Sequence, residues 1–428
     1  MNYVADSSDI TESKSIPNNW ETACLADFAI EFISGGTPST KESDFWDGEI
    51  PWTTSAPISE QDVLLCKAQR FITQRGLKSS ASNIVPKGNL IVGTRVGVGK
   101  AVTNTIDMAI SQDLTGVVLN YEKVQPEYIS YYFKTQAVQQ FFNGRKRGTT
   151  IKGVSRSDLQ SLVINLPPLP EQRAIARALR AVQAAREARL REIALERERK
   201  AALMEHLFTH GTRGEPTKMT EIGEMPEGWK TPKLADLAEI QSGGTPLRNH
   251  HEYYNGSINW AKTLDLNDGI VRSTEEKITD LGFQSIRGKI RPIDTVMVAM
   301  YGGSGTVGKS GILGIPAATN QAVCCIEPNF ERFDSLYLLY YLIHFRPNWM
   351  RYAIGTRKDP NISKGIIESL KVPLPPLGQQ KEISRTIKAC DSKITALGKE
   401  ACLLDELFRV MLEEFITGRL LAKDLILL

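Results

Sequence analysis

The chain is a tandem duplication, and no other feature of the sequence constrains its fold as strongly. The segment Ser34-Gly-Gly-Thr-Pro38 returns as Ser242-Gly-Gly-Thr-Pro246, and Leu166-Pro-Pro-Leu169 returns at the same offset as Leu374-Pro-Pro-Leu377. Similarity at a fixed period indicates repeated structural units, and two long repeats do not form a solenoid, which needs roughly three or more short ones. We therefore expect two copies of one unit.

Each copy changes character part way along. Its first part is rich in glycine, threonine and short β-branched runs such as Leu90-Ile-Val92, which predict strands bounded by turns. Pro167-Pro168 and Pro375-Pro376 then block continuation of the preceding element, and helical periodicity follows. We predict an α+β protein with two pseudo-symmetric, mainly-β domains that are separated by two long, antiparallel, coiled-coil-like helices.

The changes in composition also predict the domain boundaries. We place a flexible tail at 1–15, the first globular domain at 16–165, the first long helix at 166–213, the second globular domain at 214–373, the second long helix at 374–419 and a tail at 420–428.

The second long helix has the apolar pattern of a coiled-coil seam. Ile383, Ile387 and Ile394 belong to a strict alternation of four and three residues. A helix of this length with one apolar stripe is unstable alone, so we expect the two long helices to pack on each other. Their exposed faces would remain for partner proteins.

The first long helix begins in the same register and then departs from it. Ile175, Leu179 and Val182 fit the alternation, but two arginines occupy the next seam positions. An eleven-residue spacing that includes Leu190 and Ala201 fits the apolar residues better, and it predicts a straighter helix. A solvated face is the alternative interpretation of its many arginines.

One glycine-rich segment imitates a nucleotide-binding motif. Gly303-Ser-Gly-Thr-Val-Gly-Lys-Ser310 fits the P-loop pattern. A P-loop must open a helix, yet the following segment, Gly311–Ala317, contains glycine and proline and forms helices poorly. The equivalent segment, Gly93–Ala101, lacks the hydroxyl residue that would bind magnesium. We therefore interpret both segments as β-turns. A tight turn is also one interpretation of the two Ser-Gly-Gly-Thr-Pro segments.

Composition gives no sign of catalysis or of a membrane. The five histidines and six cysteines form neither H-E-x-x-H nor C-x-x-C patterns, so we predict no metal on this chain. No apolar run approaches the roughly 20 residues of a membrane helix, and the N-terminus lacks the features of a secretory signal. We expect a cytoplasmic protein. The net charge of +3 is too even to indicate a polyanionic partner by itself.

Glycine-lined basic loops at equivalent places in the two copies are the candidate DNA-binding sites. Glycine lets the backbone approach phosphate oxygens, while arginine and lysine neutralise their charge. Two further loops carry different side chains in the two copies, which suits different bases. A solvated basic turn is the alternative. The candidates are Arg145, Lys146, Arg147 and Lys152 in the first basic loop, Arg357 and Lys358 in the second, and Arg95, Lys100, Tyr301, Ser304 and Lys309 in the other two loops.

The whole pattern resembles a known family. Two Trp…Ser-Gly-Gly-Thr-Pro…Ile-x-Trp units, each followed by Leu-Pro-Pro-Leu-x-x-Gln and a long helix, are similar to the specificity subunit of type I restriction-modification enzymes. The similarity extends from about Ile16 to Leu420. It implies that each globular domain is a target-recognition domain for one half of a split site in double-stranded DNA, and that the helices fix the gap.

The resemblance also implies partners. Two methyltransferase (modification) subunits would dock on the helices, and restriction/translocase subunits would join through the complex. Adenosylmethionine, ATP and magnesium would be bound by those partners, with no cofactor on this chain.

Two other classes of function are alternatives. One is an enzyme, either a P-loop ATPase or a DNA methyltransferase that acts alone, but the chain lacks an Asn/Asp-Pro-Pro-Tyr tetrapeptide and a glycine-rich adenosylmethionine loop. The other is a coiled-coil scaffold that binds protein and no DNA. The salt dependence of DNA binding separates the scaffold from a phosphate-binding protein.

Overall fold

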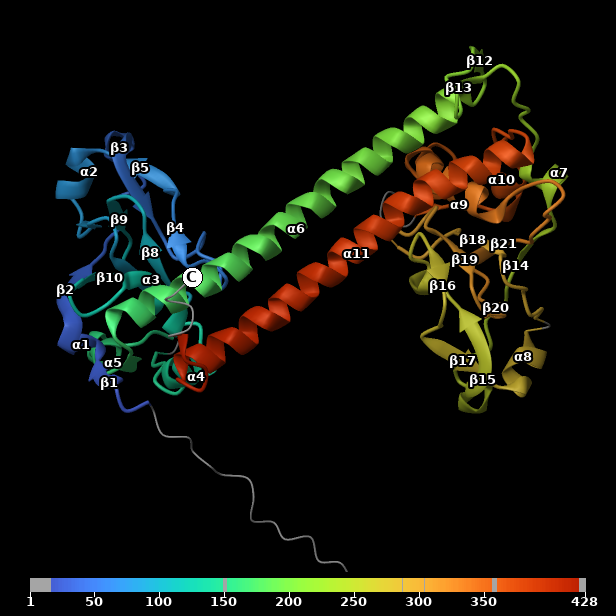
Figure 1. Cartoon of the computed structure of the whole chain (residues 1–428). Helices are drawn as coiled ribbons and strands as arrows, with labels where there is room; N and C mark the ends of the chain where they lie inside the picture. Colours follow the sequence, from blue (N-terminus) through green and yellow to red (C-terminus); the bar gives the residue numbers. More distant parts are fainter. Residues whose placement is uncertain (1–16, 149–151, 287, 304, 356–359, 423–428) are drawn as a thin grey trace, which may run out of the picture. The chain divides into compact units, whose positions relative to one another are not determined.

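The computed structural model describes residues 17–148, 152–286, 288–303, 305–355 and 360–422. Within them the chain forms two compact units, each built from one globular domain and a part of both long helices (Figure 1). Unit 1 contains the described residues of Met1–Arg189 and Glu400–Leu428, and unit 2 contains those of Leu190–Lys399. Each globular domain combines sheets with short helices, so the predicted α+β class is confirmed.

The globular domain of unit 1 contains a five-stranded sheet with the order β2-β10-β7-β8-β4 and a four-stranded sheet with the order β5-β3-β9-β6. The inner strands of the larger sheet are short apolar runs that are almost completely buried, as expected of strands covered on both faces. The strands are β1 (Glu21–Cys24), β2 (Ala29–Ser34), β3 (Trp46–Thr53), β4 (Leu64–Leu65), β5 (Arg70–Ile72), β6 (Asn83–Val85), β7 (Leu90–Gly93), β8 (Ala101–Asn104), β9 (Met108–Ile110), β10 (Leu114–Leu119) and β11 (Val163–Leu166). The short helices are α1 (Leu25–Phe28), α2 (Gln74–Lys78), α3 (Pro126–Tyr132), α4 (Gln136–Asn143) and α5 (Arg156–Gln160).

The globular domain of unit 2 repeats this plan with a five-stranded sheet of order β14-β21-β18-β19-β16 and a three-stranded sheet of order β17-β15-β20. The hairpin β12–β13 precedes them. The strands are β12 (Thr217–Thr220), β13 (Gly223–Pro226), β14 (Ile240–Ser242), β15 (Tyr254–Ala261), β16 (Ile270–Val271), β17 (Glu276–Ile278), β18 (Val296–Ala299), β19 (Ser310–Leu313), β20 (Ala318–Thr319), β21 (Val323–Ile326), β22 (Ile354–Gly355) and β23 (Pro360–Asn361). The short helices are α7 (Leu234–Leu237), α8 (Asp280–Ser285), α9 (Ser335–Phe345) and α10 (Lys364–Ser369).

The two five-stranded sheets are copies of each other. Strands β2, β10, β7, β8 and β4 correspond in order to β14, β21, β18, β19 and β16. In each sheet the last strand pairs parallel with its neighbour, and the other pairs are antiparallel. The sequence repeat is therefore a repeat of the fold.

The Ser-Gly-Gly-Thr-Pro segments need glycine because two backbones approach closely there. A Cβ atom added to Gly243 would lie 1.9 Å from the backbone oxygen of Thr319, and Gly35 in unit 1 is equally confined. The carbonyl oxygen of the next glycine accepts a hydrogen bond from the indole of Trp52 in unit 1 and of Trp260 in unit 2. Close packing, rather than the geometry of a tight turn, explains these glycines.

The segment that imitates a P-loop joins two antiparallel strands. It follows β18, and its Ser310 is the first residue of β19, with which β18 pairs. In unit 1 the equivalent segment joins β7 to β8, also antiparallel. A P-loop requires a helix after the loop. The interpretation of both segments as β-turns is therefore confirmed.

The long helices are α6 (Leu169–His210) and α11 (Leu377–Ile416), and within each unit they run antiparallel. In unit 2, Glu196 pairs with Lys393 and Lys200 with Asp391. In unit 1, Arg186 pairs with Asp405 in the same antiparallel sense. In the described ranges, none of the helices combines the length and the apolar character that a membrane crossing requires.

The eleven-residue spacing expected for the first long helix is wrong. Leu190 is 44% exposed, and Ala201 is exposed as well. The covered positions of α6 continue the alternation of four and three residues through Arg186, Arg189, Ile193, Glu196 and Lys200, and all of these except Ile193 are charged. The register is therefore the same in both helices, and it is hidden in α6 because charges replace apolar residues.

Each domain core includes residues of both long helices. In unit 1, Leu412, Phe415 and Ile416 of α11 pack in the same buried cluster as Tyr128 of α3 and Leu179 of α6. In unit 2 the equivalent cluster contains residues of α9, the end of α6 and the start of α11. Each unit is thus completed by a helix segment from the other half of the sequence.

Candidate nucleic-acid interface

The first basic loop follows α4, and the structure describes its residues up to 148 and from 152 onward. The guanidinium of Arg145 lies 3.7 Å from the centre of the Phe141 ring, and Lys146 donates a 2.6 Å hydrogen bond to Asn143. Arg145, Arg147 and Lys152 are exposed, and Lys146 is half-buried. Arg145 and Lys146 are therefore held by neutral partners.

The same loop is joined to the loop that carries Arg95. Arg147 and Gly153 exchange two backbone hydrogen bonds, of 2.8 and 2.9 Å. The amide of Val154 then donates to the carbonyl oxygen of Thr94, the residue before the exposed Arg95. The structure thus brings Arg95 and the first basic loop, which are distant in sequence, onto one surface.

Asp158 lies near this surface, and the charges of the basic loop affect the pKa of its carboxyl group. Hydrogen bonds with Ser155 lower the pKa of Asp158, and the charges of Arg147 and Arg145 lower it further. The carboxylate accepts a hydrogen bond from the backbone amide of Ser155, and the amide of Asp158 donates in return to the hydroxyl of Ser155, so the two residues form a capping box at the start of α5. Asp158 marks one boundary of the basic surface.

Lys100 lies in a different environment from Arg95. Its ammonium donates a 2.7 Å hydrogen bond to the carbonyl oxygen of Ile58, and Lys134 donates nearby to Glu60. Burial lowers the pKa of Lys134 to about 8. The two lysines fasten the loop that follows β3, so Lys100 is placed beneath the surface that Arg95 occupies.

In unit 2, Tyr301 and Lys309 flank the turn between β18 and β19, and both are half-buried. Burial raises the pKa of Tyr301, while a hydrogen bond with Gln321 lowers it. The candidates Ser304, Arg357 and Lys358 lie outside the residues that the structure describes.

Two residues that the sequence did not single out position this turn. Arg346 forms a two-point ion pair with Asp268 and donates a 3.2 Å hydrogen bond to the carbonyl oxygen of Gly308. Gly308, with a φ of +76°, packs against Trp349 so closely that a Cβ atom would lie 2.0 Å from the indole. No motif predicts this, because all three contacts join residues far apart in the chain.

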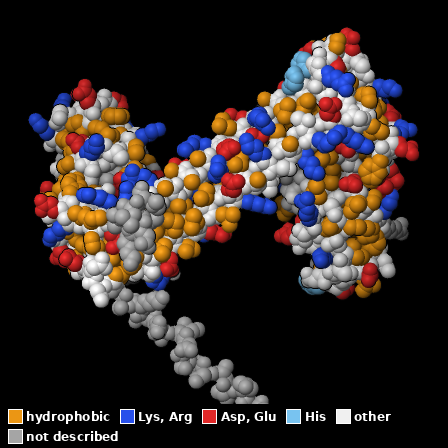
Figure 2. All heavy atoms as spheres, viewed as in Figure 1, with side chains coloured by type: hydrophobic (Ala, Val, Ile, Leu, Met, Phe, Trp, Pro, Cys, Tyr) orange, Lys and Arg blue, Asp and Glu red, His pale blue; other side chains and the backbone are white. Residues whose placement is uncertain are grey.

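Charge over the face of the molecule seen in Figure 2 is mixed. Figure 2 shows lysine and arginine side chains spread over the visible face of both units among acidic ones. This agrees with the small net charge. On this face, the described lysine and arginine side chains gather into no broad basic patch.

The six residues predicted for the helix seam are all buried or half-buried. Ile175, Leu179, Ile383 and Ile387 are completely buried in the domain cores, and Val182 and Ile394 are half-buried. The apolar surface that remains exposed on the helices consists of other residues. On α11 these are Leu403, Leu407 and Val410, which are 63%, 46% and 60% exposed.

The chain belongs to the family of type I restriction modification DNA specificity domains, whose model matches residues 17–196 and again 226–403. The two matches coincide with the two copies of the fold. The predicted membership of the type I specificity subunits is thereby confirmed.

Relatives with this description extend over almost the whole chain. The specificity subunit of the type I restriction enzyme MjaIX from Methanocaldococcus jannaschii is 22% identical, over 97% of this chain and 96% of its own. The crystal structure of the S subunit from M. genitalium has a TM-score of 0.58 at 15% identity and covers 95% of this chain and 98% of its own. The HsdS subunit from Thermoanaerobacter tengcongensis has a TM-score of 0.52 at 17% identity, with 96% and 99% covered. These structures share the fold of this chain.

Proposed function

We propose that this chain reads a bipartite site in double-stranded DNA, one half through each recognition domain, for a type I restriction-modification complex. The observation that carries the proposal is a repeated frame with unlike loops. The two five-stranded sheets have the same strand order, while the turns between equivalent strands differ: Arg95 lies in one turn and Tyr301 flanks the other, and among the candidate residues only Lys100 and Lys309 are alike. Different donors and acceptors select different bases, so two unlike turns suit two unlike half-sites.

Phosphate contacts would come from the basic loop of unit 1. Arg145 and Arg147 are exposed, their direct contacts are with an aromatic ring and with backbone groups, and Arg95 lies on the same surface. Such contacts release counterions. The logarithm of the association constant therefore falls linearly with the logarithm of the salt concentration, with a slope of about −0.9 for each phosphate contacted. Replacing Arg145, Lys146 and Arg147 together by alanine should reduce that slope by about two to three. An unchanged slope would favour a protein-binding scaffold instead.

Partner docking would use the exposed faces of the helices. Leu403, Leu407 and Val410 lie four and three residues apart, so they form one stripe on α11 that faces away from the seam. An added helix from a methyltransferase subunit would bury this stripe as a coiled coil does. Methylation, ATP-driven translocation and cleavage would then belong to the modification and restriction partners, together with adenosylmethionine, ATP and magnesium.

The test is a selection of random duplexes by the chain in complex with its methyltransferase partner. We expect the selected duplexes to share two short blocks of defined sequence, separated by a gap of constant length and variable sequence. A complex in which Arg95 is replaced by alanine should relax one block only, because the other is read by unit 2. Selection without any sequence preference would contradict the proposal.

A further inference from the structure

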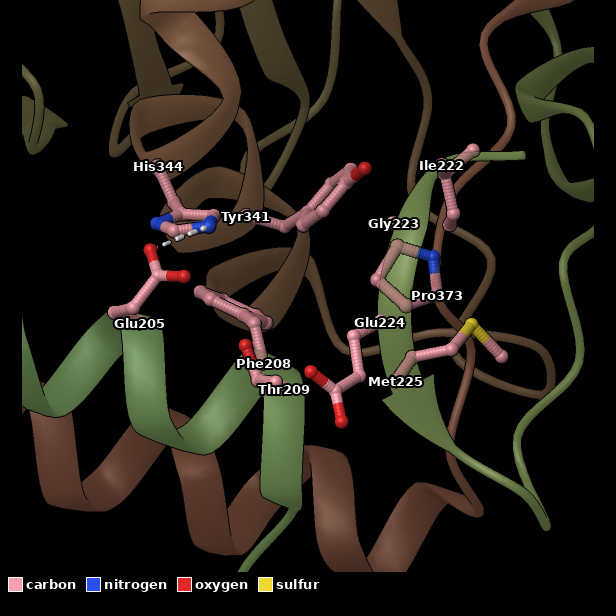
Figure 3. Close-up of a pocket in the computed structure, with 10 residues that line it drawn as sticks. All are labelled: Glu205, Phe208, Thr209, Ile222, Gly223, Glu224, Met225, Tyr341, His344 and Pro373. Carbon is pink, nitrogen blue, oxygen red and sulfur yellow. Dashed lines mark ion pairs between the residues drawn. The ribbon is translucent and has the colours of Figure 1, made fainter. Parts of the chain in front are cut away.

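A pocket in unit 2 lies away from the loops discussed above. It is formed by the end of α6, the hairpin β12–β13, α9 and the segment before α11, and its volume is about 190 Å³ (Figure 3). Engineered cavities of about 150 Å³ hold a benzene molecule, so a small organic group fits here. We call it the α9 pocket. Its lining includes Glu205, Phe208, Glu224, Tyr341, His344 and Pro373.

The buried wall of the α9 pocket is aromatic. The Phe208 ring lies 5.5 Å from that of Tyr341 and 5.1 Å from that of His344, measured between ring centres. Phe208 and Tyr341 are only 4% and 5% exposed. Aromatic faces attract cations, and the attraction grows when water is excluded.

The mouth of the α9 pocket is acidic. Figure 3 shows Glu205 on α6 and Glu224 on the hairpin at its two sides. Glu205 lies 3.7 Å from His344, and Glu224 accepts a hydrogen bond from the hydroxyl of Thr217. Burial lowers the pKa of His344, so that its ring is neutral near pH 7. Among the described residues, no lysine or arginine forms an ion pair with either carboxylate.

A hydroxyl group inside the pocket lacks the partner that its counterpart has in unit 1. Tyr132 corresponds to Tyr341, and its hydroxyl accepts a 3.2 Å hydrogen bond from the amide of Asn165. Pro373 stands in the place of Asn165, as the equivalent bonds from Tyr128 and Tyr337 to these two carbonyl oxygens show. Proline has no N–H. Over the described ranges, the Tyr341 hydroxyl therefore has no hydrogen-bond partner within the protein, although its oxygen is not sealed from solvent.

Glu205 has lost a donor in the same way. Its counterpart in unit 1, Glu413, accepts a 3.0 Å hydrogen bond from the amide of Gln136, where α4 begins. In unit 2 the equivalent amide belongs to Phe345, inside the uninterrupted helix α9. Helix amides beyond the first turn are engaged within the helix. The Tyr341 hydroxyl and the Glu205 carboxylate, whose side chain is 71% exposed, thus lack in unit 2 the backbone N–H donors that their counterparts have in unit 1.

We propose that the α9 pocket binds an organic cation, either a guanidinium or a primary ammonium group. The cation lies against Phe208 and Tyr341, donates a hydrogen bond to the Tyr341 hydroxyl and is paired with Glu205 and Glu224. It replaces the two N–H donors that unit 1 supplies itself. Its source is a basic side chain of a partner protein or a free polyamine, and the acidic mouth disfavours contact with DNA phosphates.

The experiment is calorimetric titration of the full chain with three probes: agmatine, spermidine and the blocked peptide acetyl-Gly-Arg-Gly-amide. We expect saturable binding that becomes about tenfold weaker in Glu224→Gln, as for the loss of one charge-assisted hydrogen bond. Glu227→Gln, an exposed acidic neighbour outside the pocket, is the matched control and should bind as the natural chain does.

Two conservative variants test the contribution of the Tyr341 hydroxyl to binding. Tyr341→Phe removes it without changing the ring, and Pro373→Asn restores the residue of unit 1; both should weaken binding. Tight binding of the peptide alone identifies a protein side chain as the source, and tight binding of spermidine alone identifies a polyamine. The proposal is overturned if no probe binds saturably, or if Glu224→Gln and Tyr341→Phe bind as well as the natural chain. DNA selection by Glu224→Gln should be unaltered, so this result is independent of the proposed DNA recognition.

Discussion

At the scale of single residues, equivalent positions keep a role while the residues change. In unit 1 the guanidinium of Arg70, on β5, covers the ring of Trp46 at 3.7 Å. In unit 2 the counterpart of Trp46 is Tyr254, and it is covered at 4.7 Å by Arg248, which comes from a different segment. Both units therefore place a guanidinium over the aromatic ring, but the arginine that supplies it occupies a different position in each copy of the sequence.

The paired glycines are positions where no such exchange is possible. We predict that Gly243→Ala destabilises the protein by about 3 kcal/mol, because its Cβ atom would overlap the backbone of Thr319 and the backbone cannot yield cheaply. Gly228→Ala is the control, since a Cβ atom there meets no atom within 4 Å. Chemical denaturation measures both. Equal midpoints for the two variants would contradict the close-approach argument.

At the scale of elements, α11 has two apolar faces with different roles. Ile387 is completely buried in the core of unit 2, whereas Leu403 and Leu407 are exposed. The first face holds the unit together, and the second is offered to a partner under the proposed function.

Substitutions on the two faces of α11 should therefore have opposite consequences. We predict that Ile387→Ala lowers the free energy of unfolding by about 3 kcal/mol, as for a large buried side chain. Leu403→Ser combined with Leu407→Ser should change stability little and abolish co-purification with the methyltransferase subunit. Denaturation and affinity purification are the measurements. If the double variant still co-purifies with the methyltransferase subunit, the exposed stripe of α11 is not the docking surface.

The same elements show what a sequence can and cannot predict. The repeat, the β-turn in place of a P-loop and the seam of α11 follow from local spacing and composition. The seam of α6 does not, because Arg186 and Glu196 are covered by pairing with Asp405 and Lys393 on the other helix. Apolar periodicity cannot detect a charged seam. The support of the turn by Arg346 likewise depends on contacts between distant residues.

At the scale of the whole molecule, the proposal that the two long helices set the gap between the half-sites can be tested by changing their length. Seven residues inserted into both long helices, after Arg189 and after Lys399, preserve the seam because the alternation repeats every seven residues. They lengthen each helix by about 10 Å. We predict a gap between the half-sites that is about three base pairs longer, at 3.4 Å per step, with both half-sites unchanged. Selection from random duplexes measures the gap, and an unaltered gap would show that the helices do not set it.

The completion of unit 1 by α11 has a consequence for synthesis. Leu412, Phe415 and Ile416 belong to a core whose other members are made far earlier by the ribosome. The first domain to leave the ribosome is therefore the last to be finished, and until then it exposes the apolar surface that α11 will cover. A chain stopped before residue 400 would lack these three residues, so we expect it to expose this apolar surface and to be degraded more readily than the full chain.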